Sequence, residues 1–190
     1  MNQSMSTSVN PEHIITQIKR IVESDKRSEI RLNANGGNSI LLVCPPEMEF
    51  QYIEKLIEMM PSDIYKIIDI NEMMISFVEA YKADIGEMFD LLRGSVHQIF
   101  KAPEGETSPD LFKHILGAIK QTFMENKIPV LIHTGALYGS GIDNIHLMEN
   151  ELVMKSKTPL IILYPATQDG DKLMFLNSRP ASKYRCMIVK

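Results

Sequence analysis

A glycine-rich segment that follows an apolar strand is the first place in this chain where chemistry can be sought. Residues 134–143 read Thr-Gly-Ala-Leu-Tyr-Gly-Ser-Gly-Ile-Asp, and such a loop at the start of a helix can present backbone N–H groups to an anion. The segment has no lysine, and Asp143 stands where an acidic residue caps a helix rather than binds phosphate. We therefore favour glycines that permit a tight turn. The alternative is a small α/β enzyme or nucleotide-dependent switch that uses the Gly135–Gly141 loop.

The turn after the first expected strand carries no phosphate chemistry. The strand Ser39–Cys44 runs into Pro45-Pro46-Glu47, where a nucleotide-binding α/β protein would carry the Walker A pattern G-x-x-x-x-G-K-[ST]. Two prolines offer no N–H group, and a glutamate repels phosphate. The pattern favours an assembly protein over an enzyme, with no cofactor and no catalytic residue.

Histidine and aspartate at strand ends are the other residues that could do chemistry. The five histidines form no H-x-x-x-H or H-E-x-x-H pattern, so no metal site is expected. His133 follows an apolar strand, at the sheet edge where ligands gather in α/β folds; we interpret it as a core histidine bonded to backbone. Asp69 ends another strand, and we interpret it as a helix-capping or salt-bridging residue. In the enzyme alternative both would join the Gly135–Gly141 loop.

Composition places the chain among globular proteins. It has 190 residues, 44% hydrophobic and 23% charged, with a net charge of -4. An acidic balance argues against direct binding of nucleic acid. The two cysteines, Cys44 and Cys186, lie beside apolar residues and are expected to be buried thiols in a reducing compartment. No apolar run reaches the length of a membrane span and residues 1–9 do not resemble a signal peptide, so we expect a cytoplasmic protein.

Helices and strands alternate along the chain. The expected helices begin at Pro11, Met48, Glu72, Ile85, Pro109 and Ile142, with Asn10, Asn71 and Ser108 as caps. Expected strands are Ser39–Cys44, Tyr65–Ile70, Ile128–His133 and Pro159–Tyr164, and their continuous apolar runs are typical of parallel strands covered on both faces. We expect Lys172–Leu176 and Tyr184–Val189 to form an antiparallel pair at the carboxyl-terminal edge. We interpret Met73, Met74, Phe77, Met88 and Phe89 as core residues, with a partner-binding surface as the alternative.

The sequence thus predicts a flexible segment 1–9 followed by one α/β domain, 10–190. The domain is expected to have three layers, with a mostly parallel sheet between helices on both faces. We found no internal repeat and no low-complexity linker.

The carboxyl-terminal third, from Ile128 onward, resembles the BrxB family of bacteriophage exclusion (BREX) defence systems. The likeness rests, in order and spacing, on Gly135–Tyr138, Pro159–Pro165, Asp169–Leu173 and Tyr184–Val189. This chain has Ala166 where the family has a glycine. The resemblance implies a non-enzymatic accessory subunit of antiviral defence, with a fold akin to P-loop NTPase domains but without the Walker A loop.

The resemblance also implies a partner. The family associates with PglZ, a protein similar to alkaline phosphatases, within a complex that holds a DNA methyltransferase and an ATPase. The similar segments lie in loops after strands, where an α/β sheet presents its binding edge. We therefore expect protein-protein interaction with a PglZ-like subunit and other BREX subunits, with contacts at Asp169, Asp171, Tyr184 and Arg185.

Overall fold

Five parallel strands form the central sheet of the computed structural model, which describes residues 10–24, 27–103, 105–106, 108–170, 172–181 and 185–190. The strand order is β2-β3-β4-β1-β7. Their bounds are β1 Ser39–Cys44, β2 Tyr65–Asp69, β3 Ile128–Ile132, β4 Leu160–Asp169 and β7 Met187–Val189. The expectation of an α/β fold with a mostly parallel sheet is confirmed, while the expected flexible segment 1–9 lies outside the described residues.

Apolar side chains on both faces explain why these strands pair in parallel. Every residue of β1 and β3 is buried. Along β1 the side chains alternate, with Leu41 and Val43 in one apolar core and Ile40 and Leu42 in the other. A strand that packs on both sides needs helices above and below it, and the helical connections between strands provide them.

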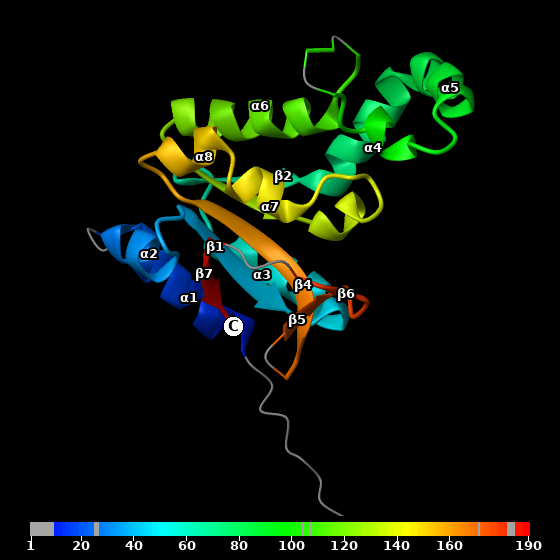
Figure 1. Ribbon diagram of the computed structural model, residues 1–190. Coiled ribbons are helices and arrows are strands. Elements are labelled where there is room, and N and C mark those ends of the chain that lie inside the picture. Colours follow the sequence, from blue (N-terminus) through cyan, green and yellow to red (C-terminus); the bar gives the residue numbers. More distant parts are fainter. Residues whose placement is uncertain (1–9, 25–26, 104, 107, 171, 182–184) are drawn as a thin grey trace, which may run out of the picture.

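The helices divide between the two faces of the sheet (Figure 1). On one face lie α1 (Pro11–Val22), α2 (Arg27–Asn33) and α3 (Glu49–Met59). On the other lie α4 (Ile70–Ala80), α6 (Leu111–Met124), α7 (Asn144–Met148) and α8 (Glu151–Lys155). Helix α2 occupies a charged stretch that we expected to follow the first helix. The expected helix from Ile142 is two short helices, α7 and α8.

Two helix caps differ from the expected ones. The Asp69 side chain accepts hydrogen bonds from the backbone N–H groups of Asn71 and Glu72, so Asp69 and not Asn71 caps α4. Asp110 caps α6 through the N–H of Lys113, which displaces the expected cap at Ser108. An aspartate closer to the first helical residue supplies the same acceptor. The predicted cap of α1, Asn10, is confirmed by its bond from Glu12.

The predicted antiparallel pair of Lys172–Leu176 with Tyr184–Val189 is wrong. Strand β5 (Lys172–Phe175) pairs instead with the second half of β4, residues 166–169, and with β6 (Arg179–Pro180). Strand β7 pairs in parallel with β1. The physical reason is proximity: β4 runs on past the parallel sheet, and the tight turn at Gly170 returns the chain directly onto it. The edge of β1 then remains open for β7.

Beyond α4 the chain forms an arm that points away from the sheet (Figure 1). The arm is α5 (Lys82–Leu91), which has no buried residue. The short helix η2 (Val96–Ile99) returns to the body of the domain, where Ile99 is buried. The single helix predicted from Ile85 to Phe100 is therefore wrong. Core packing is confirmed for Phe77, whereas Phe89 is exposed. Among the described residues, no helix is long and apolar enough to cross a membrane.

Candidate functional site

Three ionisable side chains from separate elements gather at the carboxyl ends of the parallel strands. Glu49 begins α3 after β1, Asp69 ends β2, and His133 directly follows β3. Strands β2 and β3 are paired neighbours, so the residues at their ends meet. This edge of an α/β sheet is where such folds place their ligands.

Asp69 fixes the orientation of His133. One carboxylate oxygen of Asp69 lies 2.9 Å from Nδ1 of His133, and the other caps α4. A carboxylate acceptor holds the proton on Nδ1 and leaves Nε2 as the remaining ring nitrogen. The His133 side chain is 42% exposed, so the expected core histidine is wrong. The interpretation of Asp69 as a helix-capping or salt-bridging residue is confirmed, because its carboxylate caps α4.

The backbone of His133 is unusual. Its φ of 53° and ψ of 37° lie in the left-handed region, which histidine enters more often than most residues but which is uncommon outside glycine. The conformation ends β3 abruptly and turns the chain into the short helix η3 (Thr134–Leu137). The left-handed conformation thus ends the strand at His133, and the His133 ring lies within hydrogen-bond distance of Asp69.

Glu49 adds a carboxyl group in a partly buried position. Burial raises its pKa above the ordinary value, the charge of Asp69 raises it further, and His133 lowers it. Its Oε1 atom is buried with no hydrogen-bond partner. Among the described residues no group of three His, Cys, Asp or Glu side chains is arranged to hold a metal ion. Of this trio, only Asp69 and His133 share a hydrogen bond in the described part of the chain, and Glu49 acts on them through its charge.

Neither cysteine supplies an effective nucleophile. Both cysteines are buried, as expected. Burial raises the pKa of Cys44 far above its ordinary value, with Glu49 and Glu47 adding to the effect. Burial likewise raises the pKa of Cys186 to about 12. A thiol that stays protonated is not an effective nucleophile.

The turn after β1 has few free donors for a phosphate. Pro45 and Pro46 have no N–H group, and the short helix η1 (Pro46–Met48) uses the N–H groups of Met48 and Glu49 for its own carbonyls. The remaining N–H belongs to Glu47, whose side chain is exposed and acidic. The sequence interpretation of this turn agrees with its geometry.

Several N–H donors in and after the Gly135–Gly141 loop bond within the loop. The N–H groups of Ala136, Tyr138 and Ser140 bond to carbonyls three residues back, and that of Ile142 bonds to the Ser140 hydroxyl. Gly141 has a φ of +78°, and a Cβ placed there would lie 2.7 Å from Cβ of His97. The glycines therefore serve turn geometry and close packing, which is the interpretation favoured from the sequence.

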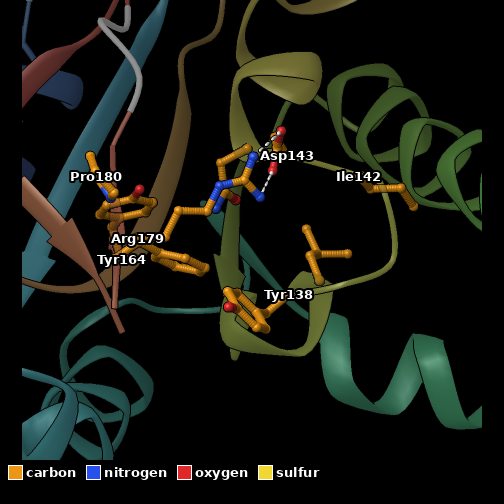
Figure 2. A pocket seen from close by; sticks show the side chains of 9 residues that line it. Tyr138, Ile142, Asp143, Tyr164, Arg179 and Pro180 are labelled. Carbon is orange, nitrogen blue, oxygen red and sulfur yellow. Dashed lines mark hydrogen bonds and ion pairs between the residues drawn. The ribbon is translucent and has the colours of Figure 1, made fainter. Parts of the chain in front are cut away.

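A pocket lies between this loop and the β5–β6 hairpin (Figure 2). It is lined by Leu137, Tyr138, Ile142, Asp143, Asn144, Tyr164, Phe175, Arg179 and Pro180. Its cavity of about 20 Å³ holds about one water molecule. The rings of Tyr164 and Phe175 stack at a centroid distance of 4.7 Å. A nucleotide does not fit this space.

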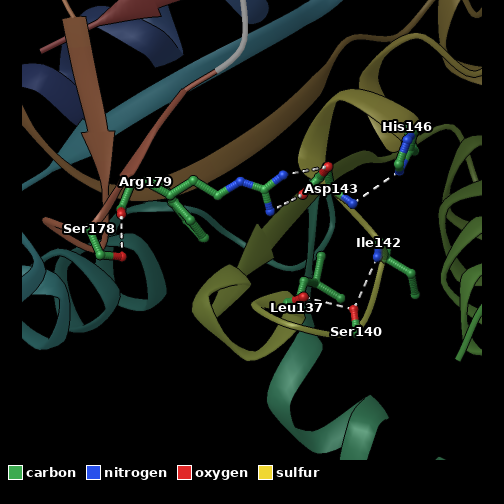
Figure 3. Close-up of polar contacts among 8 residues, drawn as sticks. Leu137, Ser140, Ile142, Asp143, His146, Ser178 and Arg179 are labelled. Carbon is green, nitrogen blue, oxygen red and sulfur yellow. Dashed lines mark hydrogen bonds and ion pairs between the residues drawn. The ribbon is translucent and has the colours of Figure 1, made fainter. Parts of the chain in front are cut away.

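Arg179 and Asp143 join the hairpin to the loop across that pocket. The two guanidinium nitrogens lie 3.2 and 3.5 Å from the two carboxylate oxygens of Asp143 (Figure 3). The N–H of Asp143 donates to Nδ1 of His146, which holds the start of α7. Burial lowers the pKa of His146, and the charge of Lys101 lowers it further. A neutral imidazole can accept that bond.

Neither of the predicted contact residues that the structure describes, Asp169 and Arg185, lines this pocket. Asp169 ends β4 beside the Gly170 turn and is exposed. Arg185 is exposed before β7, not within it, and its side chain forms no bond to other described residues. Its backbone carbonyl lies so close to Gly37 that an added Cβ there would stand 1.9 Å away. Asp171 and Tyr184 lie outside the described residues.

Sequence reasoning missed Glu49, Asn144 and Arg179. The position of Glu49 soon after the first strand could have indicated a site residue, but an acidic residue in the first turn of a helix is common. Arg179 gave none, because its partner Asp143 lies 36 positions away. No family model, curated protein or solved structure matches this chain.

Proposed function

We propose that this chain is a non-enzymatic accessory subunit of a BREX anti-phage defence complex that acts by binding a PglZ-like subunit. The observation that carries the proposal is spatial. Two of the segments that resemble BrxB, Gly135–Tyr138 and Pro159–Pro165, lie on separate elements and meet at one pocket, to which they contribute Leu137, Tyr138 and Tyr164. Such convergence on a surface is what partner recognition requires.

Missing phosphate chemistry supports a role other than nucleotide hydrolysis. The turn after β1 has two prolines and an exposed glutamate, and its neighbouring donors are bonded within η1. In this chain β1 lies inside the parallel sheet, between β4 and β7. A fold of P-loop NTPase type that has lost its Walker A loop would keep such a sheet. The strand order differs from the dinucleotide-binding and flavodoxin-like orders. We therefore propose a degenerate nucleotide-binding fold used as a binding scaffold.

An enzyme or switch is the second candidate, favoured by one observation. Asp69 orients His133 at the sheet edge, as a general base would need. The internal bonding of the Gly135–Gly141 loop opposes a phosphate site there. An assay for turnover should therefore compare the unaltered chain with a variant of His133 rather than with variants of the loop glycines.

Affinity purification of the tagged chain with the PglZ-like protein of its own defence system tests the main proposal. We expect the two proteins to elute as one complex, and the double variant Asp169→Lys/Asp171→Lys to weaken it. The matched control is Glu29→Lys/Glu54→Lys, which changes the charge equally at exposed positions on α2 and α3. Failure of the unaltered chain to retain the partner at micromolar concentration would exclude the proposed function.

A further inference from the structure

A residue that lines the pocket between the Gly135–Gly141 loop and the β5–β6 hairpin has an unsatisfied acceptor. Asn144 is only 4% exposed, and its Oδ1 atom has no hydrogen-bond partner. Buried side-chain polar atoms are nearly always bonded, so each exception needs an explanation. Asn144 is one of the residues that line the pocket. Because this atom is itself buried, a donor from outside the chain reaches it only when a neighbouring side chain of the pocket moves away.

A second acceptor at the pocket is held by an exchangeable contact. The Asp143 carboxylate bonds to Arg179, and the two side chains are 40% and 56% exposed. Exposed ion pairs contribute little net stability, since water competes for both partners. Another guanidinium can therefore replace that of Arg179 at a small loss. In Figure 2 the Arg179 side chain reaches across from the hairpin to Asp143.

Aromatic rings complete the chemistry of the pocket. Tyr138 is 55% exposed on the loop side, and Tyr164 forms part of the wall with its ring against Phe175. Arginine stacks on aromatic faces and bonds carboxylates through a planar fork, and lysine does neither as well. Two oxygen acceptors beside exposed ring surface thus match an arginine side chain.

We propose that this pocket receives an arginine side chain of the PglZ-like partner, and that Arg179 occupies the Asp143 carboxylate in the free chain. The incoming guanidinium bonds Asp143 and Asn144 and lies against Tyr138, while Arg179 moves out to solvent. This inference rests on the proposed function, because it names the anchor point of that complex. It makes Arg179 a competitor of the partner and not part of the contact.

Binding constants for the purified PglZ-like protein test this exchange. We expect Asp143→Asn, Asn144→Leu and Tyr138→Ala each to weaken binding at least tenfold. Arg179→Ala should leave the affinity unchanged or tighten it several-fold, because the competitor is gone. If the Arg179–Asp143 ion pair only supports the fold, Arg179→Ala and Asp143→Asn should weaken binding of the PglZ-like protein equally, and that result would overturn the inference. Equal binding by all variants also overturns the inference, and thermal unfolding of each variant shows whether it is folded.

A partner-free measurement separates the pocket from the proposed function. In Arg179→Ala, millimolar N-acetylarginine amide should raise Tm more than N-acetyllysine amide does, and the added change Asp143→Asn should abolish the difference. Such stabilisation without capture of the PglZ-like protein would support the pocket chemistry and overturn the proposed function. Capture without selective stabilisation, and without the variant pattern above, would leave the complex intact and overturn the arginine anchor.

Discussion

Asp69 and His133 are 64 positions apart in the sequence, yet a 2.9 Å hydrogen bond joins them at the ends of neighbouring strands. The same carboxylate caps α4 through two backbone N–H groups. One side chain thus caps a helix and orients a histidine from the neighbouring strand.

We expect Asp69→Ala to lower the free energy of unfolding by about 1–3 kcal/mol, the sum of a lost helix cap and a lost charge-assisted bond. Urea denaturation measures the change. The control is Asp63→Ala, at an exposed position in the preceding turn, which should alter stability by no more than about 0.5 kcal/mol. Equal effects of the two substitutions would show that Asp69 has no structural role.

Glu49→Gln should stabilise the protein at pH 7. Burial raises the pKa of Glu49 above its ordinary 4.5 in the folded state. Between the ordinary pKa of the unfolded chain and the raised pKa of the folded chain, the folded chain binds more protons, so the free energy of unfolding falls as pH rises. The glutamine variant avoids this loss, and its advantage should grow from pH 4 to pH 7. We expect the Tm of the glutamine variant to exceed that of the unaltered chain at pH 7 and to approach it near pH 4.

Thermal scans at several pH values check the sign of that effect. An advantage of Glu49→Gln that is constant from pH 4 to pH 7 would mean that ionisation of Glu49 is not involved. Glu47→Gln is the matched control, since Glu47 is exposed in the same turn.

Gly37→Ala should destabilise the chain by about 1–3 kcal/mol, the usual effect of overpacking. An added Cβ would stand 1.9 Å from the carbonyl oxygen of Arg185, and backbone on both sides cannot move aside easily. Gly86→Ala in α5 meets no atom within 4 Å, so it should stabilise by roughly 0.5–1 kcal/mol. Chemical denaturation of both variants decides, and a tolerated Gly37→Ala would mean that the segment before β7 does not pack on Gly37.

ATP and GTP should leave Tm unchanged at millimolar concentration. A ligand that binds only the folded state raises its stability in proportion to the logarithm of ligand concentration. The N–H groups of Met48, Ala136, Tyr138 and Ser140 already bond to backbone carbonyls, and the loop after β3 has no lysine. A shift of several degrees with either nucleotide would refute this expectation and favour the switch.

Local sequence patterns predicted much of the secondary structure. The bounds of Ser39–Cys44 follow from its unbroken apolar run, and Asn10 with Pro11 marks the start of α1. Partners across the sheet were harder to predict. Nothing in Met187–Val189 specifies which strand it joins, because three apolar residues fit many registers, and its parallel pairing with β1 depends on where β4 and β5 leave an open edge.

The candidate site shows the same division. Asp69 and His133 were each identified as strand-end residues, but their contact depends on β2 lying beside β3. Glu49 and Arg179 carry no motif, and their surroundings arise only when distant segments pack together. Residue type and position were readable from the sequence, whereas proximity required the topology.

Strand β4 pairs with different neighbours along its length. Residues 160–165 pair with β1 inside the parallel sheet, and residues 166–169 pair with β5 in the exposed hairpin. Backbone amides along one continuous strand should therefore differ in hydrogen exchange, with slow exchange at Ile161–Leu163 through global unfolding and faster exchange beyond Ala166 through local opening. Because Tyr164 at the junction also lines the pocket, the exchange gradient along β4 becomes an internal reporter of whether that pocket is filled.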